Sequence, residues 1–261
     1  MSETFAAEFD ACFTADVEPD CPPYLTSCRG MSEGLPRLLD LLAMVNVSGT
    51  FFTTGEMARR FPAIVQRLVK EGHELGCHGD QHLDFTTLTR EQTCGELRDS
   101  LHTLRQFAPV VSFRAPYLRF PSDYLPLLVE HGLHIDSSIA RYKFGRDHRA
   151  DVSVPGLIRV PASLTSSVLR LPSLMRNVWL SSMRPPVVIF VHPWEAVDFR
   201  SSALRLDCRF HTGDVALRRW RDVLLRMHQR GARFRRLNQI AVDPETAQAG
   251  ADSAQSSNAP L

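Results

Sequence analysis

The chain has 261 residues, of which 44% are hydrophobic and 23% charged, a composition typical of an ordinary globular protein. Its 30 lysines and arginines almost balance its 29 aspartates and glutamates, so the net charge of +1 argues against electrostatic capture of nucleic acid. No apolar run approaches the roughly 20 residues needed to cross a bilayer, and the acidic start lacks a signal-peptide core. We therefore expect a cytoplasmic protein whose six cysteines are free thiols.

The first half of the chain alternates between strand-like and helix-like patterns. Residues 9–17 are rich in apolar and β-favouring residues and are predicted as a strand. Leucines at helical spacing follow Ser32, which can cap a helix that runs to about Val45. The next predicted elements are a strand at 49–54, a helix at 62–71, a strand at 74–77 and a helix behind the capping-box sequence Thr89–Gln92.

The second half continues this alternation less regularly. Strands are predicted at 110–113, 133–135, 157–160, 187–191 and 233–237, with helices at 122–130 and 214–230. The run Val-Val-Ile-Phe-Val at 187–191 is continuously apolar, as expected for a strand covered on both faces. Residues 1–242 are predicted to form a single domain, and the small, polar residues 243–261 a disordered tail.

Strands that alternate with helices imply a parallel sheet. The chain is therefore predicted to be an α/β protein with a (β/α) barrel of seven or eight strands. In such barrels, functional side chains lie at the carboxyl ends of the strands. The polar residues that end or follow the predicted strands are Asp16, Glu18, His78, His82, Arg114, Asp136 and His192. We expect them to point into one mouth of the barrel.

Two of these residues, His78 and His82, are spaced four apart just after the strand at 74–77. On a helical turn, residues i and i+4 share a face, so the spacing could present two imidazoles to one metal ion. A catalytic zinc usually takes three protein ligands, which leaves a carboxylate to be found. Because two solvated surface histidines would show the same spacing, the pair indicates a site only together with the other polar residues.

Several short motifs occur in order along residues 9–195, which is most of the chain. They are Phe13-Thr-Ala-Asp16-Val-Glu18, Gly49-Thr-Phe-Phe-Thr-Thr-Gly55, Gly72-His-Glu-Leu-Gly-Cys-His78-x-x-x-His82, Phe113-Arg-Ala-Pro-Tyr117, Asp136-Ser-Ser and Phe190-Val-His192-Pro-Trp-Glu195. In this order they resemble the polysaccharide deacetylase (NodB-homology, carbohydrate esterase) family, and the first and last variants are similar to its exopolysaccharide-cluster branch. The resemblance implies a distorted (β/α) barrel that holds one divalent metal ion and hydrolyses an amide on a sugar.

The resemblance also implies a role for each polar residue. The metal ligands would be Glu18, His78 and His82; Asp16 would be the general base, Arg114 would hold Asp16, His192 would be the general acid, and Asp136 would orient His192. The chain departs from the commoner family pattern of adjacent aspartates, because Val17 separates the two carboxylates. Asp16 and Glu18 still point to the same side of an extended segment, and Asp20 is an alternative ligand.

The chemistry that follows is amide hydrolysis. A metal ion, expected to be zinc although iron or cobalt would also suit these ligands, polarises the amide carbonyl and lowers the pKa of a bound water. In the roles that the resemblance implies, Asp16 would remove the water proton, the backbone N–H of Tyr117 would help to hold the oxyanion, and His192 would protonate the departing amine. Tyr117 and Trp194 could supply the apolar walls for a sugar ring.

The predicted function is therefore removal of an N-acetyl or N-formyl group from an amino sugar, which could be a lipid-linked or nucleotide-linked precursor. Two alternatives stay open: hydrolysis of a small cyclic amide on the same scaffold, and a carbohydrate-binding relative without turnover. The unusual Asp16-Val17-Glu18 sequence makes the second alternative credible.

One further stretch, residues 169–184, mixes large apolar residues with several arginines and contains no acidic residue. Such a segment could lie at a membrane surface or meet a lipid-diphosphate carrier. The alternative is an amphipathic helix packed against the barrel.

Overall fold

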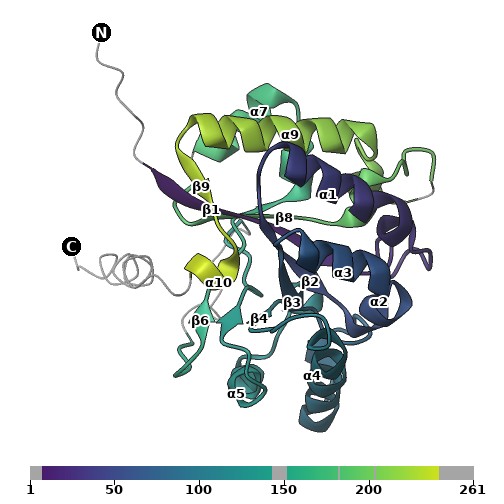
Figure 1. Cartoon of the computed structure of the whole chain (residues 1–261), viewed down its shortest axis with the longest axis vertical. Helices are drawn as coiled ribbons and strands as arrows, with labels where there is room; N and C mark the ends of the chain where they lie inside the picture. The colour runs from purple at the N-terminus through teal and green to yellow at the C-terminus, as the bar shows by residue number, and fades with distance from the viewer. Residues whose placement is uncertain (1–7, 143–151, 182, 203, 241–261) are drawn as a thin grey trace.

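The fold is organised around one parallel sheet, seen in a computed structural model that describes residues 8–142, 152–181, 183–202 and 204–240 (Figure 1). The predicted tail at 243–261 lies outside the described residues. In chain order, the strands are β1 (Phe9–Val17), β2 (Gly49–Thr53), β3 (Glu74–Cys77), β4 (Ser112–Phe113), β5 (Ile135–Asp136), β6 (Ile158–Arg159), β7 (Leu164–Thr165), β8 (Val187–Val191) and β9 (Ala232–Phe234).

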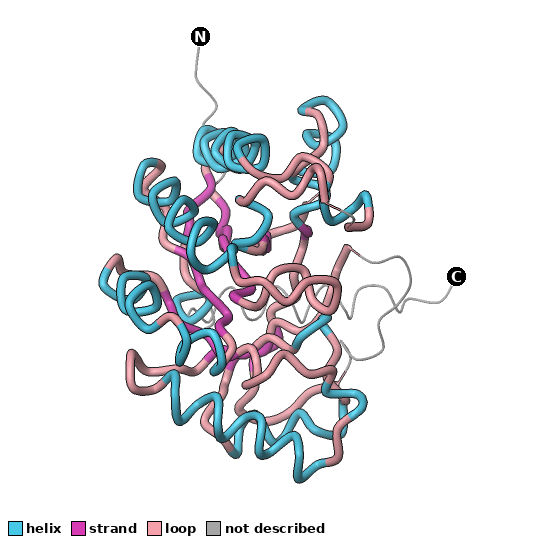
Figure 2. Tube along the Cα trace, turned by 90° about the vertical axis from the view of Figure 1, so that its right-hand side faces the viewer, coloured by secondary structure: helices cyan, strands magenta, loops and turns pink. Residues whose placement is uncertain are grey.

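Strand β1 is the centre of the sheet. The strand order is β6-β5-β4-β3-β2-β1-β8-β7, with β9 paired to the start of β1, and each of these pairings is parallel. The sheet curls, with helices on its outer side and strands in the interior (Figure 2). The predicted distorted (β/α) barrel is confirmed, although it has nine strands among the described residues because two-residue β7 was not predicted.

The helices that cover the sheet are α1 (Leu35–Met44), α2 (Gly55–Arg60), α3 (Pro62–Lys70), α4 (Arg90–Leu104), α5 (Leu125–Glu130), α6 (Ser166–Leu169), α7 (Ser173–Ser181), α8 (Leu206–Arg209), α9 (Asp214–Gln229) and α10 (Leu237–Ile240). Short 3₁₀ turns lie at Phe85–Thr87, Pro116–Leu118, Ser122–Tyr124 and Pro193–Ala196. None of the helices in the described part of the chain combines the length and apolar character needed to span a bilayer.

Two predicted helix starts had different outcomes. At α4 the capping box is confirmed: Thr89 Oγ1 accepts from the Gln92 N–H at 3.3 Å, and Gln92 Oε1 accepts from the Thr89 N–H at 2.8 Å. The predicted cap at Ser32 is wrong, because a π-helical turn (Gly30–Gly34) precedes α1. The carboxylate of Asp20 accepts the backbone N–H groups at the start of that turn, so the chain begins to coil before Ser32.

The core has an outer and an inner part. Apolar side chains of β1 and β8 pack against α1 and α9, and a second cluster lies under α4 and α5. A smaller cluster combines Cys12, Phe52, Ile135 and Val188 of the strands and Val160, which follows β6, with Leu237 and Ile240 of α10. Helix α10 therefore replaces the end of the strand predicted at 233–237, and its apolar side chains join the strand cluster.

Candidate active site and metal centre

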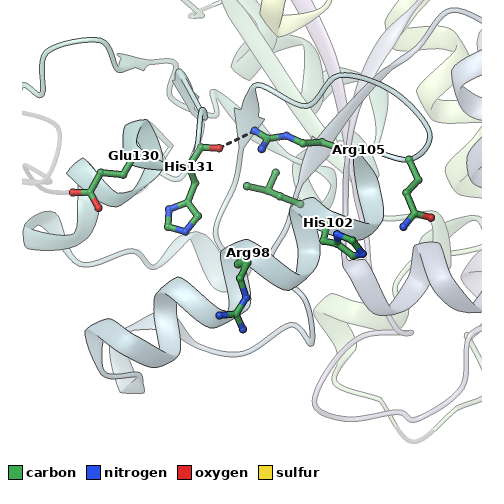
Figure 3. Close-up of a pocket in the computed structure, with 7 residues that line it drawn as sticks. Arg98, His102, Arg105, Glu130 and His131 are labelled. Atoms are coloured by element: carbon green, nitrogen blue, oxygen red, sulfur yellow. Dashed lines mark hydrogen bonds between the residues drawn. The ribbon is translucent and has the colours of Figure 1, made fainter.

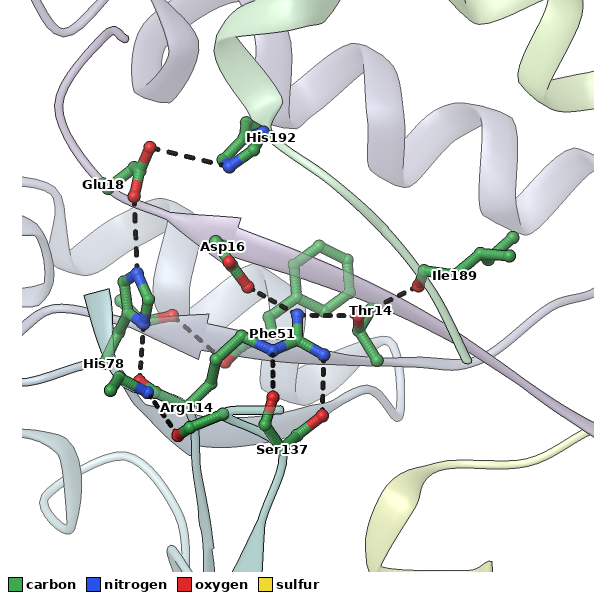
Figure 4. Close-up of polar contacts among 12 residues, drawn as sticks. Thr14, Asp16, Glu18, Phe51, His78, Arg114, Ser137, Ile189 and His192 are labelled. Atoms are coloured by element: carbon green, nitrogen blue, oxygen red, sulfur yellow. Dashed lines mark hydrogen bonds and ion pairs between the residues drawn. The ribbon is translucent and has the colours of Figure 1, made fainter. Parts of the chain in front are cut away.

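Five predicted site residues meet at the carboxyl end of the sheet (Figure 4). Asp16 and Glu18 lie at the end of β1, His78 directly after β3, Arg114 directly after β4 and His192 directly after β8. Since these strands are parallel, their carboxyl ends meet at one edge, which is where barrel proteins carry their functional side chains.

Glu18, His78 and His82 form a candidate metal-binding group. All three side chains are buried, and one potential ligand atom from each lies within 4.8 Å of the others. Glu18 Oε2 is 3.3 Å from His78 Nε2 and 2.5 Å from His82 Nε2. Burial opposes the charged form of Glu18, but the neighbouring histidines outweigh it and hold the pKa of this carboxyl well below its usual range.

The His78 ring is oriented by a backbone carbonyl. Its Nδ1 lies 2.7 Å from the carbonyl oxygen of Arg114, which can only accept, so Nδ1 carries the proton. Nε2 is then left with its lone pair directed toward Glu18 (Figure 4). A metal-binding histidine commonly donates its other ring N–H in this way.

His82 supplies the strongest test of whether these residues fit a metal. Both of its ring nitrogens are buried: Nδ1 has no hydrogen-bond partner among the described residues, and Nε2 lies 2.5 Å from Glu18 Oε2. Burying a polar atom without a partner costs about 1–3 kcal/mol, so fold stability alone does not account for this buried side chain. Because a cation held by two imidazoles and a carboxylate would satisfy it, this donor set fits a divalent metal ion.

The loop that carries the two histidines differs from the expected helical turn. Residues 78–82 are not helical, and the backbone has positive φ at Gly79 (76°) and at His82 (56°). The shared orientation of His78 and His82 therefore comes from a tight bend and not from the i, i+4 spacing of a helix.

This bend is braced by side chains from two helices. The Arg59 guanidinium of α2 makes a bidentate ion pair with Asp80, with distances of 2.7 and 2.8 Å. Glu96 Oε2 of α4 accepts the backbone N–H groups of Asp80 and Gln81 at 2.9 and 3.0 Å. Gly55 allows this close approach, since a Cβ atom there would lie 2.0 Å from Asp80 Oδ1.

Asp20, the alternative ligand, is used elsewhere. Its carboxylate accepts from Ser27 Oγ at 2.6 Å and from the N–H groups of Arg29 and Gly30 at 2.7 Å each. The structure therefore places Glu18, and not Asp20, beside the two histidines.

Asp16 is held by a fully buried arginine. Arg114 Nη1 donates to Asp16 Oδ1 at 2.7 Å and to Thr14 Oγ1 at 2.9 Å, while its Nη2 donates to Ser137 Oγ at 2.9 Å. The guanidinium also lies 4.3 Å from the centre of the Phe52 ring. With this many contacts, Arg114 fixes the position of Asp16, as expected from the sequence.

His192 faces Glu18 from the end of the neighbouring strand β8. Its Nε2 lies 3.8 Å from Glu18 Oε1. Burial disfavours the imidazolium, but the surrounding carboxylates, chiefly Glu18 and Glu195, outweigh it and raise the pKa of His192 to about 9. A cation bound at Glu18 would offset part of that attraction.

The carboxylate that contacts the other nitrogen of His192 belongs to Glu195. Glu195 Oε1 is 3.3 Å from His192 Nδ1. Asp136, expected in this role, instead forms an ion pair with Arg159 at 2.6 Å and accepts from Ser138 Oγ at 2.5 Å. Its side chain is therefore engaged beside β6, and the expectation that it orients His192 is corrected to Glu195.

Glu195 is itself held by a residue that sequence reasoning missed. The buried Arg170 guanidinium lies 3.6 Å from Glu195 Oε1 and donates to the backbone carbonyls of Asp207, Cys208 and Phe210. Glu195 could have been found as the acidic residue three positions after His192. Arg170 carries no such signal, because it reaches the site only through the fold.

The two predicted sugar-contacting aromatics differ in exposure. Tyr117 is 40% exposed and packs edge-on against the His82 ring at 4.9 Å, so it lies beside the candidate metal centre. Trp194 is only 5% exposed: it stacks on His192 at 5.2 Å, and its Nε1 donates to Glu18 Oε1 at 3.4 Å. Trp194 therefore supports these two side chains and offers no open face to a sugar ring.

A separate surface hollow of about 590 Å³ lies between α4 and α5 (Figure 3). It is lined by Arg98, His102, Arg105, Glu130 and His131, among others. The Arg105 side chain crosses the hollow, and its Nη2 donates to the His131 carbonyl oxygen at 2.7 Å. Because none of the predicted site residues lines it, we assign it no part in the site.

The fold and the site define a (β/α)-barrel protein with a candidate metal centre at the carboxyl end of its sheet. Comparison with known sequences agrees: residues 18–135 match the family described as polysaccharide deacetylase. Over these residues the chain is similar to the polysaccharide deacetylase family, as its motifs predicted.

Individual relatives match over parts of their length. The chain is 41% identical over 75 residues to a peptidoglycan-N-acetylmuramic acid deacetylase of Bacillus subtilis, covering 28% of each protein. It is 30% identical over 136 residues to a chitooligosaccharide deacetylase of Sinorhizobium fredii, covering 51% of this chain and 60% of the relative. The chain thus spans less than two thirds of these curated relatives.

A solved structure matches the whole fold more fully. It is a peptidoglycan N-acetylglucosamine deacetylase with a TM-score of 0.61 at 21% identity, covering 90% of this chain and 88% of the other. At this identity the likeness establishes the shared fold.

Proposed function

We propose that the chain is a metal-dependent amide hydrolase that removes an N-acetyl or N-formyl group from an amino sugar. The observation that carries the proposal is the buried set of Glu18, His78 and His82, with Asp16 and His192 beside it. The names of the relatives, which are deacetylases of peptidoglycan and chitooligosaccharides, support an N-acylated amino sugar as the substrate.

Glu18, His78 and His82 would hold the metal. When bound, a divalent ion polarises an amide carbonyl and makes water a better nucleophile at neutral pH. Two imidazoles and one carboxylate suit zinc, and iron or cobalt as well.

Asp16 would accept the proton of the attacking water. Its ion pair with Arg114 fixes the carboxylate at the end of β1, so the base does not have to reorganise as the reaction begins. The backbone N–H of Tyr117 would donate to the oxyanion of the intermediate, as the family resemblance implies. The exposed Tyr117 ring, packed against His82, would form one wall for the sugar.

His192 would donate a proton to the departing nitrogen. An unprotonated amide nitrogen is a very poor leaving group, so the step requires a positioned acid. Glu195 lies at His192 Nδ1 and thereby leaves Nε2 on the side of Glu18 to serve as the donor. The Glu195–Arg170 pair would keep the ring in this orientation.

The direct test combines metal analysis with product detection. Purified protein should contain one divalent metal ion per chain and should release acetate from N-acetylated chitooligosaccharides or peptidoglycan fragments, or formate from N-formylated sugars. A chelator should abolish release, and added metal should restore it. Metal binding without turnover would favour a carbohydrate-binding relative, and turnover of cyclic amides alone would favour the non-sugar hydrolase.

Two narrower expectations also stand as proposals. The substrate could be a lipid-linked or nucleotide-linked precursor, which the same assay tests by including N-acylated sugar nucleotides and lipid-linked sugars. A cytoplasmic location agrees with the six cysteines, which are all free thiols. Fractionation of cells that express the protein tests the location.

A further inference from the structure

Helix α7 (Ser173–Ser181) packs with its apolar face turned outward. Leu174 is 80% exposed, Met175 57% and Val178 68%, and Trp179 is exposed on the same side of the helix. Arg176, on the opposite side, is only 3% exposed. A helix that merely covers a barrel buries its apolar residues and exposes its charged ones, so α7 shows the reverse of the usual arrangement.

The inverted orientation is held from beneath by α9, beside which α7 lies at the edge of the molecule (Figure 1). Leu180 packs on the large core cluster that contains residues of α9. Burial lowers the pKa of Arg176, and the carboxylate of Asp222 opposes that shift. Arg219 and Arg226 lower the pKa further, so α9 presents charges of both signs to this guanidinium. Burying an arginine is costly. Because α7 buries Arg176 while it exposes Leu174 and Val178, we infer that another molecule covers its exposed face.

The charges around this face are mostly positive. From Ser173 to Arg184 the sequence contains two arginines and no aspartate or glutamate. Arg184 and Arg226 are exposed, and Arg230 reaches the end of α7, where its Nη1 donates to Ser181 Oγ at 3.4 Å. Asp222 is an exposed acidic residue near this surface, on α9. The result is an apolar stripe with an arginine rim.

We propose that the exposed face of α7 binds the surface of an anionic lipid bilayer. Apolar side chains on an interfacial helix enter the boundary between headgroups and acyl chains, while flanking arginines attract the negative headgroups. A second copy of the chain fits the surface less well, because a symmetric contact would bring the two arginine rims together. The proposal is independent of the catalytic site, since α7 contributes no residue to it.

The test is flotation of the full chain with lipid vesicles. Vesicles of phosphatidylcholine with about one third phosphatidylglycerol should carry the protein upward at low salt, and pure phosphatidylcholine vesicles should carry much less, because arginines near an anionic surface add to binding. High salt should release most of it. Absence of co-flotation with the anionic vesicles at low salt would overturn the proposal.

Two double variants assign the binding to the surface. Leu174→Glu with Val178→Glu should lower the bound fraction roughly tenfold or more, since both acidic groups would enter the apolar boundary. Arg184→Gln with Arg230→Gln should weaken binding about fivefold per arginine, and only to anionic vesicles. Circular dichroism and melting temperature should stay unchanged, because the altered side chains are exposed.

A matched control is available on another helix. Met44 of α1 is 70% exposed, and Met44→Glu should leave flotation unchanged. Equal loss in this control, or full binding by the Leu174 and Val178 double variant, would contradict an assignment to α7. So would a lipid-free dimer that this double variant dissociates, because a second copy would then cover the face.

Discussion

At the scale of single residues, the candidate site depends on which atoms of each residue contact the metal-binding group of Glu18, His78 and His82 and the residues beside it. Arg114 shows this twice: its guanidinium holds the Asp16 carboxylate, and its backbone carbonyl accepts the Nδ1–H of His78. One residue after β4 thus positions both the candidate base and one candidate metal ligand.

Asp16→Asn tests the proposed base. The variant keeps the shape of the side chain and can still accept a hydrogen bond from Arg114, but it no longer removes a proton. We expect kcat for acetate release to fall about 10²–10⁴-fold with metal content unchanged. Nearly full activity in Asp16→Asn would show that another group is the base, and loss of metal would place Asp16 among the ligands.

His73 predicts a pH dependence of stability that is unrelated to catalysis. The ring is buried, Nδ1 accepts from the Gly49 N–H at 3.0 Å, and burial lowers the pKa of His73 from 6.5 to about 4. The unfolded chain therefore takes up this proton first as the pH falls. Its contribution to stability is complete above pH 6.5 and is lost between there and pH 4, by up to about 3 kcal/mol at 1.36 kcal/mol per pKa unit.

Urea unfolding across this pH range measures the effect. His73→Gln keeps an acceptor for Gly49 and should flatten the decline relative to the parent protein. His134→Gln, at an exposed ring, serves as the control and should retain the parental slope. Identical slopes for His73→Gln and the parent would mean that His73 is protonated in the folded state.

The sequence predicted which residues gather at the candidate site better than it predicted the ion pairs that these residues form. Asp16, Glu18, His78 and His192 could be found because each one ends or follows an apolar strand, and parallel strands end together. The engagement of Asp136 with Arg159 and of Glu195 with Arg170 depends on side chains from distant elements. Local sequence carries no signal for such pairs.

At the scale of elements, the bend at residues 78–82 is the part that fixes the candidate metal ligands. It is braced from α2 by Arg59 and from α4 by Glu96, neither of which touches the ligand atoms directly. Residues that orient metal ligands typically change metal affinity by about 10–100-fold when removed. Arg59 and Glu96 should therefore raise the affinity for metal, although neither residue is a ligand.

Glu96→Ala removes the acceptor for two backbone N–H groups of this bend. We expect the metal dissociation constant to rise about 10–100-fold, measured by competition with a chelator. Asp99→Ala, which alters an exposed carboxylate of the same helix, should have little effect. If both variants bind metal like the parent, the bend does not depend on α4.

Long elements were predicted from the sequence, and short ones were not. β1 and β8 match their predicted bounds, and α9 matches to within a residue, because each carries a long apolar pattern. β7 has two residues and α10 has four, so neither is long enough to show a period. The bend at 78–82 was mistaken for a helical turn because the spacing of its histidines suits both structures.

At the scale of the whole molecule, α10 is tied to the amino-terminal half of the barrel through one buried carboxyl. Glu74 of β3 accepts from Thr50 Oγ1 of β2 at 2.7 Å, from Ser112 Oγ of β4 at 2.5 Å and from the Asn238 N–H of α10 at 3.0 Å. Burial raises the pKa of Glu74, and these hydrogen bonds oppose the shift. The carboxyl thus links three strands to the last helix.

Glu74→Ala leaves these donors buried without their acceptor. We expect the free energy of unfolding to fall by about 3 kcal/mol, since an unsatisfied buried group costs about 1–3 kcal/mol. Denaturant unfolding measures it, with Glu71→Ala at a more exposed neighbouring position as the control. An equally small loss in both variants would mean that α10 is held by its apolar contacts alone.

The account as a whole depends on one metal ion at the carboxyl end of the barrel. Anomalous diffraction from crystals grown with zinc locates it directly. We predict a single strong peak within about 2.0–2.2 Å of a Glu18 oxygen, His78 Nε2 and one ring nitrogen of His82, with Asp16 and His192 nearby. A peak held by other residues, or none at all with Glu18 turned away from the two histidines, would contradict the proposed hydrolase.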